Sequence, residues 1–363
     1  MPKTRNYGID LLRMLSMLMI IVLHMMGNGG ILAAAEPQSA HYWVAWALET
    51  AAYCAVNCYA LISGYVGVDT EHRAGSIIFL WLQVVFYTVS LTVLFALLLP
   101  GSVTANNVLR ALLPVSFRQY WYFTSYFCLF FFLPALNHLF SLPRRQLRNL
   151  VLAIAALLSL LPTLRGYDLF QTNAGYSVIW LGALYVLGGY LKRYQPLSFL
   201  SIRGGLVLYG ACTAVSWLWK LVAESLSLSG DSGRLINYTS PTILLASVAL
   251  LTAFTAMRLP TLPRKLASVA APLAFSVYLI HAQPLVWEHL IKDRFPPLLQ
   301  FSPLAFGCAV LVVALGIYLV CSVIDFVRFH LFRLLRIRAF ADRCARLAGN
   351  ILAQLAARAG GRS

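Results

Sequence analysis

The first apolar stretch of the chain carries three ionisable residues, Asp10, Arg13 and His24. Asp10 and Arg13 are three residues apart, so in a helix they share a face and can form an ion pair. Arg13 and His24 are eleven residues apart, three turns plus roughly 20°, which places them on one face about 16 Å apart along the axis. A guanidinium can bind a phosphate, and an imidazole can accept a proton near neutral pH. The stripe therefore suggests a functional site and does not by itself name the reaction. A snorkelling arginine and an interfacial histidine are its structural alternative.

Later apolar stretches carry polar and aromatic residues that are candidates for binding a substrate. They are Asn57, Ser63, Gly64, Tyr65, Trp121, Tyr122 and His281, together with Arg73 in the loop that follows Tyr65. Each type has a structural alternative, because Ser and Gly permit close helix packing and aromatic residues form belts at the membrane interface. A histidine inside an apolar helix is a satisfied structural residue about as often as a catalytic one. These residues suggest a site without naming its reaction.

The composition identifies the kind of structure that must position these residues. Of the 363 residues, 60% are hydrophobic and 11% are charged, whereas soluble domains carry about 25% charged residues. This composition excludes a soluble enzyme fold and predicts an all-α, polytopic integral membrane helical bundle. The apolar stretches predict about ten transmembrane helices, over 9–26, 43–66, 76–99, 120–140, 147–164, 175–191, 204–225, 241–257, 268–287 and 303–327.

The distribution of Lys and Arg predicts the orientation of this bundle. With the N-terminus in the cytoplasm, the inside segments hold 20 of the 28 basic residues and the outside loops hold six, as the positive-inside rule requires. Both termini are therefore expected in the cytoplasm. We expect a transmembrane bundle over 1–327 and a basic amphipathic tail over 328–363, which contacts membrane lipids rather than nucleic acid. A cleaved secretory signal is disfavoured because its apolar stretch would contain Asp10, Arg13 and His24.

Four motifs, in order along the chain, resemble those of the membrane-bound acyltransferase-3 family. Arg13 and His24 match its Arg-x10-His motif, and Asp10 resembles the acidic residue that precedes the arginine. The segment 57–65, NCYALISGY, is similar to the family's aromatic-rich Ser-Gly-Tyr/Phe segment. The segment 121–137 resembles its fourth-span motif, and 278–281, YLIH, resembles its late Tyr-x-x-His segment. Ten spans also fit, so the likeness covers nearly the whole chain.

The resemblance implies a membrane O-acyltransferase, in the usual case an O-acetyltransferase. Such an enzyme moves an acyl group from cytoplasmic acyl-CoA, usually acetyl-CoA, to a hydroxyl of a surface or secreted glycan. Acyl-CoA would be a donor substrate rather than a permanently bound cofactor, and the acceptor would be a glycan or a lipid-linked saccharide. The implied location is the bacterial inner membrane. The seven cysteines have no zinc-site spacing, so no metal is expected.

The implied reaction gives the candidate residues their roles. His24 would act as general base or as transient acyl carrier, Arg13 would bind a CoA phosphate, and Asp10 would orient Arg13. Trp121 and Tyr122 would stack on a sugar ring. The loop after Tyr65 departs from the family's fuller Arg-x-x-Arg pattern, since it offers a single arginine, Arg73, among Asp69, Glu71 and His72.

Two other classes of function are open at this point. A transporter or flippase would use Asp10, Arg13, His24 and His281 as a polar pathway and would move its substrate without forming an ester. Such proteins often contain paired halves, and the sequence shows no such duplication. A glycan-assembly scaffold without chemistry would tolerate replacement of both Arg13 and His24.

Overall fold

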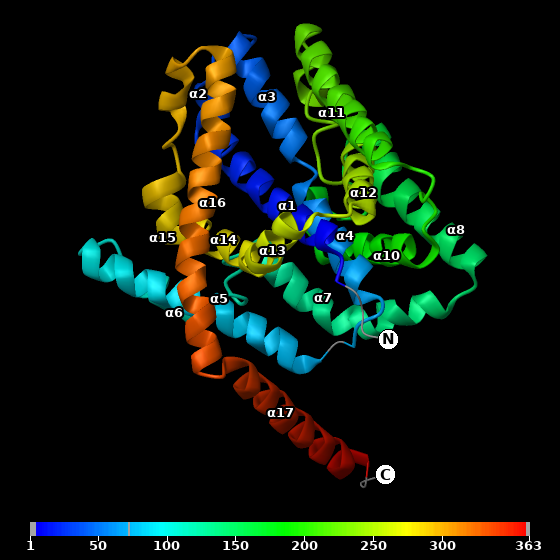
Figure 1. The fold of residues 1–363 in the computed structure, drawn as a ribbon, viewed down its shortest axis with the longest axis vertical. Helices are drawn as coiled ribbons and strands as arrows, with labels where there is room; N and C mark the ends of the chain where they lie inside the picture. The colour runs from blue at the N-terminus through cyan, green and yellow to red at the C-terminus, as the bar shows by residue number, and fades with distance from the viewer. Residues whose placement is uncertain (1–4, 72, 361–363) are drawn as a thin grey trace.

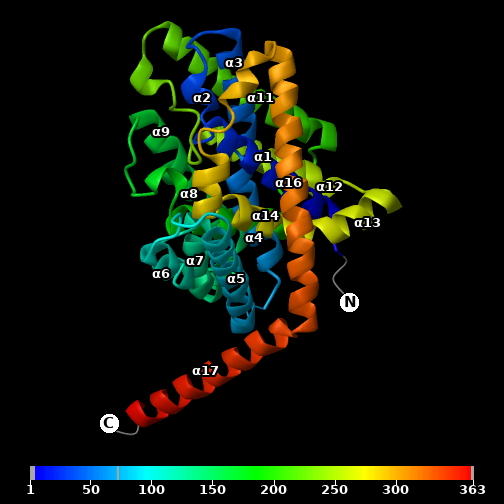
Figure 2. The ribbon, with the colours of Figure 1, turned by 90° about the vertical axis from the view of Figure 1, so that its left-hand side faces the viewer.

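A computed structural model of the chain describes residues 5–71 and 73–360, and these residues form helices and no strand (Figures 1 and 2). The expected all-α class is therefore confirmed. His72 and the ends of the two expected segments, 1–4 and 361–363, lie outside the described residues.

Short loops, 3₁₀ turns and two π-helical turns connect the α-helices. The α-helices are α1 (Tyr7–Met26), α2 (Ile31–Ala34), α3 (Ala40–Ala52), α4 (Ala55–Gly67), α5 (Ala74–Leu98), α6 (Ala105–Leu112), α7 (Trp121–His138), α8 (Arg144–Ala155), α9 (Leu161–Arg165), α10 (Val178–Tyr194), α11 (Ile202–Ser225), α12 (Pro241–Ala256), α13 (Thr261–Ala270), α14 (Ala274–His281), α15 (Pro284–Val286), α16 (Pro303–Leu334) and α17 (Ile337–Gly360). The π turns, Ala156–Leu160 and Trp287–Ile291, follow α8 and α15.

The central helix of the bundle is α1, which packs against α3, α4, α12, α14 and α16. Figure 1 shows it crossing the middle of the molecule. Asn6 caps its N-terminus, because the side-chain oxygen accepts a hydrogen bond from the backbone N–H of Gly8 at 2.9 Å. A Cβ on Gly8 would lie 1.8 Å from the carbonyl oxygen of Phe254, so α1 and α12 cross in direct backbone contact. This crossing fixes the position of the helix that carries the three ionisable residues.

The membrane-spanning character of the chain is confirmed, but the count of ten spans is not. Six described helices are long and apolar enough to cross a membrane, and the bent pair Thr261–His281 with Pro284–Gln300 would provide a seventh. The expected span 43–66 is divided into α3 and α4 at Tyr53 and Cys54, and the bent pair, which contains the expected span 268–287, turns by 62°. The apolar content of a sequence window identifies an apolar stretch, but it does not show where the helix within that stretch is broken. The chain is a multi-pass membrane protein, and its orientation stays a prediction.

The expected boundary between the bundle and the tail falls within α16. Arg328, expected as the first cation of the tail, lies inside α16 and is 4% exposed. Its guanidinium donates to both carboxylate oxygens of Asp325 at 2.8 Å. Asp325 also accepts a 2.5 Å hydrogen bond from the hydroxyl of Tyr87 in α5. A charge at this depth persists only when it is paired, so this network ties α16 to α5.

Beyond α16, the chain continues as α17, whose first turns contact α5 and whose C-terminal part extends away from the other helices (Figure 2). Arg338 donates a hydrogen bond to the hydroxyl of Ser76 at 3.0 Å, and Asp342 lies against Gly75. The tail is thus a helix attached to the bundle at its first turns, and its contact with lipid stays a prediction.

Candidate active site

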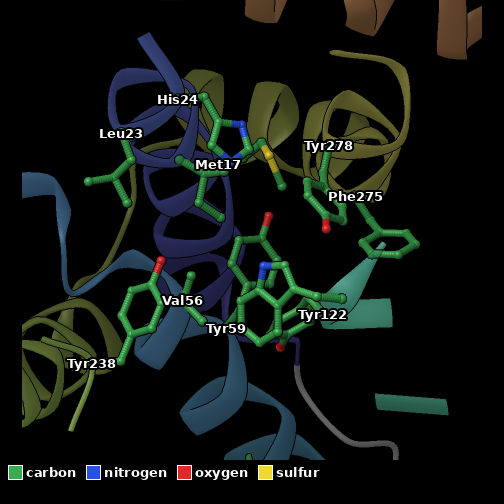
Figure 3. A pocket seen from close by; sticks show the side chains of 11 residues that line it. Met17, Leu23, His24, Val56, Tyr59, Tyr122, Tyr238, Phe275 and Tyr278 are labelled. Carbon is green, nitrogen blue, oxygen red and sulfur yellow. The ribbon is translucent and has the colours of Figure 1, made fainter. Parts of the chain in front are cut away.

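The stripe predicted on the first helix faces a pocket. Met17, Ile20, Leu23 and His24, all in α1, line it together with one aliphatic and six aromatic residues of four other elements: Val56 and Tyr59 from α4, Trp121 and Tyr122 from α7, Phe275 and Tyr278 from α14, and Tyr238 from the loop before α12. We call this the aromatic pocket. Figure 3 shows His24 across it from Tyr59 and Tyr122. Met17, Ile20 and His24 thus lie on one face of α1, toward this pocket.

His24 contacts a second histidine. Its Nδ1 lies 2.9 Å from Nε2 of His281, which is 1% exposed at the C-terminal end of α14. The edge of Trp287 packs against the His24 ring, with centroids 4.8 Å apart and planes at 85°. Two histidines that are 257 residues apart in the sequence thus form a pair inside the bundle.

The partners of this pair determine which nitrogen of each ring carries a proton. Nδ1 of His281 lies 2.6 Å from the carbonyl oxygen of Val277. A carbonyl can only accept, so Nδ1 of His281 carries hydrogen and its Nε2 offers a lone pair. Nδ1 of His24 must then be the donor to that lone pair. In the neutral pair, Nε2 of His24 is left with its own lone pair free for chemistry.

His24 also lines a larger cavity of about 570 Å³. Its walls come mainly from the ends of α1, α3, α7 and α14 and from the loops before α10 and α12: Leu23, His24, Gly27, Asn28, Glu49, Tyr53, Gln119, Tyr120, Trp121, Tyr176, Tyr238, Tyr278, Ala282, Pro284, Trp287 and Glu288. We call this the large cavity. Leu23, His24, Trp121, Tyr238 and Tyr278 belong to both walls. The imidazole therefore lies at the junction of the two spaces.

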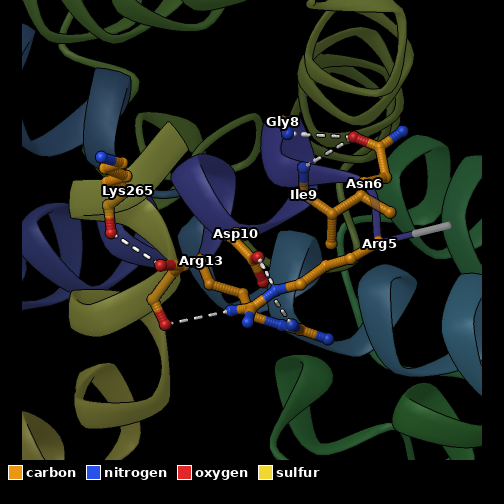
Figure 4. A network of polar contacts seen from close by, with 8 residues as sticks. Arg5, Asn6, Gly8, Ile9, Asp10, Arg13 and Lys265 are labelled. Carbon is orange, nitrogen blue, oxygen red and sulfur yellow. Dashed lines mark hydrogen bonds and ion pairs between the residues drawn. The ribbon is translucent and has the colours of Figure 1, made fainter. Parts of the chain in front are cut away.

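At the other end of α1, one carboxylate holds two arginines (Figure 4). Asp10 is 3% exposed and accepts hydrogen bonds from Arg5 at 2.5 Å and from Arg13 at 3.1 Å. The expected Asp10–Arg13 pair is present. Arg5 was missed, because only the fold of the segment before α1 brings it to Asp10. With two cations on one anion, this cluster carries a net positive charge that suits a phosphate.

The candidate residues of α4 lie in structural contacts. The amide of Asn57 is buried, donates to the carbonyl of Tyr238 at 2.8 Å and accepts from the indole of Trp180 at 3.0 Å. Ser63 donates to the carbonyl of Tyr59 within its own helix. A Cβ on Gly64 would lie 1.9 Å from the carbonyl oxygen of Tyr185, so this glycine permits the close approach of α4 and α10. Asn57 thus positions a wall residue of both spaces.

The remaining candidates divide between the site and the surface. Trp121 lines both spaces, and Tyr122 lines the aromatic pocket. Tyr65 lies away from these spaces, with the ammonium of Lys192 4.9 Å from its ring centroid. Arg73 has a side chain that is 74% exposed and pairs with Glu71, and it lines neither space. The structure therefore does not bring Tyr65 or Arg73 to His24.

Several wall residues were missed because loops and a broken helix supply them. Tyr176 and Tyr238 lie in the loops before α10 and α12, and their ring centroids are 5.0 Å apart. Burial, together with Tyr176 and Tyr53, raises the pKa of Tyr238 well above its ordinary value, so its phenol keeps its proton. Glu49 lies in α3, just before the break that divides the expected second span. Nothing in its spacing along the sequence points toward His24.

The loop that carries Tyr176 is fastened by Asp168. This carboxylate accepts hydrogen bonds from the backbone N–H of Thr172 at 3.0 Å and of Asn173 at 2.6 Å. Partial burial opposes the charged form, but these hydrogen bonds outweigh it and lower the pKa of Asp168 below its ordinary value. Gly175, at φ +94°, then turns the chain where a Cβ would lie 2.5 Å from Tyr238. Tyr176 thereby reaches the large cavity.

Comparison with known proteins gave one match. A family model described as an acyltransferase domain, that of acyltransferase family 3, matches residues 6–323. The comparisons with curated proteins and with solved structures gave no match. Among the described residues, no group of three or more His, Cys, Asp or Glu side chains could hold a metal ion.

Proposed function

Because the chain belongs to the acyltransferase-3 family, we propose that it transfers an acetyl group from cytoplasmic acetyl-CoA to a hydroxyl of a surface or secreted glycan in the bacterial inner membrane. The family makes the chain an acyltransferase, which neither transport without ester formation nor a scaffold without chemistry accounts for. The acetyl donor, the glycan acceptor and the role of His24 are the proposed part.

The observation that carries the proposal is the position of His24, whose ring lines both the aromatic pocket and the large cavity. If the donor enters through one space and the acceptor through the other, the general base must lie where the two spaces meet, because it has to contact the acceptor hydroxyl next to the thioester. The hydrogen bond to His281 orients this base, because it holds the proton on Nδ1 of His24 and leaves Nε2 unprotonated.

We propose that Nε2 of His24 acts as general base rather than as acyl carrier. It removes the proton of the acceptor hydroxyl while the hydroxyl oxygen forms a bond to the thioester carbonyl carbon. The carbon–sulfur bond then breaks, and the proton on Nε2 passes to the departing thiolate of CoA. The products are the ester and free CoA. The imidazolium formed in between is stabilised by its hydrogen bond to the lone pair of His281.

The cluster around Asp10 supports a place for the donor. Arg13 has a side chain that is 32% exposed, so its guanidinium is accessible while Asp10 holds it. We propose that Arg13 binds a CoA phosphate, with Arg5 adding to the positive charge, and that the acyl arm extends along the stripe of Met17 and Ile20 toward His24. The spacing of about 16 Å along α1 leaves room for an extended arm.

The large cavity supports a place for the acceptor. Trp121 and Tyr176 pack there with ring centroids 4.5 Å apart, and such amphipathic rings offer both an apolar face and a polar edge. The acceptor is a glycan or a lipid-linked saccharide whose hydroxyl reaches Nε2 of His24. Tyr122, which lines only the aromatic pocket, contacts the acyl arm rather than the sugar in this arrangement.

The experiment that tests this function measures free CoA released by the full chain in lipid nanodiscs. We expect release from acetyl-CoA to rise when base-treated, and therefore unacylated, surface polysaccharide of the host strain is added. Acetyl ester should form in equal amount. CoA release without ester, or no dependence on the polysaccharide, would contradict a glycan acceptor.

A further inference from the structure

The large cavity contains a carboxylate that the proposed mechanism does not use. Glu49 lines this cavity and is 8% exposed. Its Oε2 has no hydrogen-bond partner among the described residues. Glu49 is also absent from the ion pairs formed within the described part of the chain. A buried acceptor without a donor is costly, and it gains most from a ligand that brings one.

Aromatic rings form the wall beside this carboxylate. The centroids of Tyr53 and Tyr238 are 4.9 Å apart, those of Tyr238 and Tyr176 are 5.0 Å apart, and the planes of Trp121 and Tyr238 differ by 24°. Apolar faces next to a single strong acceptor suit a ligand with carbon–hydrogen faces and hydroxyl edges. A sugar ring has this distribution of groups.

The charged residues that line the large cavity indicate which kind of sugar it can bind. No Lys or Arg is among the described residues that line it, and its acidic members are Glu49 and Glu288. Glu288 pairs with Lys292 at 2.9 Å and is 58% exposed, so it is already neutralised in water. Glu49 is therefore a buried lining carboxyl with no cation beside it. A uronic acid or a phosphorylated sugar would find no Lys or Arg in this lining to offset its charge, whereas an uncharged sugar needs none.

We propose that Glu49 is the hydrogen-bond acceptor of a subsite for a neutral acceptor sugar. Its carboxylate accepts from one hydroxyl of a ring that stacks on Trp121 and Tyr238, and the ring thereby presents a different hydroxyl to Nε2 of His24. Glu49 binds and orients the sugar, while His24 removes the proton of the hydroxyl that is acylated. The inference rests on the proposed function, because it names the acceptor class for that same site.

The test measures transfer of radiolabelled acetyl from acetyl-CoA to base-treated surface polysaccharide of the host strain, divided by anion exchange into neutral and acidic fractions. The full chain in nanodiscs is compared with Glu49→Met, which removes both carboxyl oxygens at a similar side-chain length, and with the matched control Glu36→Met, at an exposed glutamate that lines neither space. We expect Glu49→Met to raise the polysaccharide KM at least about tenfold, as loss of a buried hydrogen bond predicts. The KM for acetyl-CoA should stay unchanged, Glu36→Met should behave as wild type, and label should enter the neutral fraction.

Each other outcome contradicts the proposal in a distinct way. An unchanged polysaccharide KM in Glu49→Met removes Glu49 from the subsite while leaving acyl transfer in place. Label confined to the acidic fraction overturns the neutral class. No transfer by the wild type would contradict the proposed function itself. If Glu49→Met fails to fold, Glu49→Ala and Tyr176→Ala take its place, and normal polysaccharide KM values in both would overturn the subsite.

Discussion

The Nδ1 atom of His24 lies 2.9 Å from Nε2 of His281, and the carbonyl of Val277 holds the other nitrogen of His281 at 2.6 Å. This chain of two hydrogen bonds runs from the backbone of α14 to the ring in α1. It gives His281 a role in positioning His24 rather than in contacting substrate. His281, a candidate binding residue in the sequence, is thus a hydrogen-bond partner of His24.

The His24–His281 contact predicts different effects for two replacements of His281. In His281→Phe, Nδ1 of His24 loses its acceptor, so we expect kcat to fall about 100-fold, within the range of general-base contributions. In His281→Gln, the amide oxygen can accept the same hydrogen bond and should restore a large part of that activity. The KM values for donor and acceptor should stay unchanged in both variants. Equal loss in both, with lower thermal stability, would indicate a structural role alone.

Arg13→Lys tests the donor end of the site. Lys keeps the charge but cannot form two parallel hydrogen bonds to one phosphate, so we expect the KM for acetyl-CoA to rise about tenfold. The KM for the polysaccharide should not change, because the large cavity does not include Arg13. Arg73→Lys, in the exposed loop, is the matched control and should leave both KM values as in wild type. A changed acceptor KM in Arg13→Lys would contradict the placement of the donor.

The buried network of α16 predicts a large effect on stability. Asp325→Ala leaves the guanidinium of Arg328 buried without its carboxylate, which costs about 3–5 kcal/mol in comparable pairs. We expect a marked fall in the thermal unfolding midpoint in detergent. Arg333→Ala removes an exposed arginine one turn further along α16 and should shift the midpoint little. Similar midpoints for Asp325→Ala and wild type would contradict the network's role.

Asp168 predicts a pH-dependent loop. Since the folded state lowers the pKa of this carboxyl, its contribution to stability is present above the ordinary Asp pKa of about 3.9 and is lost as the pH falls through the lower folded pKa. At pH 7, Asp168→Asn should speed hydrogen exchange at the amides of Thr172 and Asn173. The difference between variant and wild type should shrink as the pH approaches 3. A difference that is independent of pH would argue against the charged carboxylate as the fastening group.

The sequence predicted the helical class and the axial stripe of the site, because helical periodicity and apolar content are local properties. Asp10 and Arg13 pair as their spacing of three requires. Glu49 and Tyr176 could not be predicted, since a helix break and a loop bring them to His24. The burial of Arg328 could not be predicted either. It depends on the pairing with Asp325 and on the packing of α5, whereas the sequence shows only that Arg328 follows an apolar run.

The most direct test of the central claim is the O-acetyl content of the surface glycan, measured by NMR in a strain that lacks this chain. The strain is complemented with wild type or with His24→Ala at equal abundance. We predict that wild type restores the acetyl signals and that His24→Ala does not. Equal restoration by both would contradict His24 as the base, and no acetyl difference between the deletion and wild-type strains would contradict glycan O-acetylation.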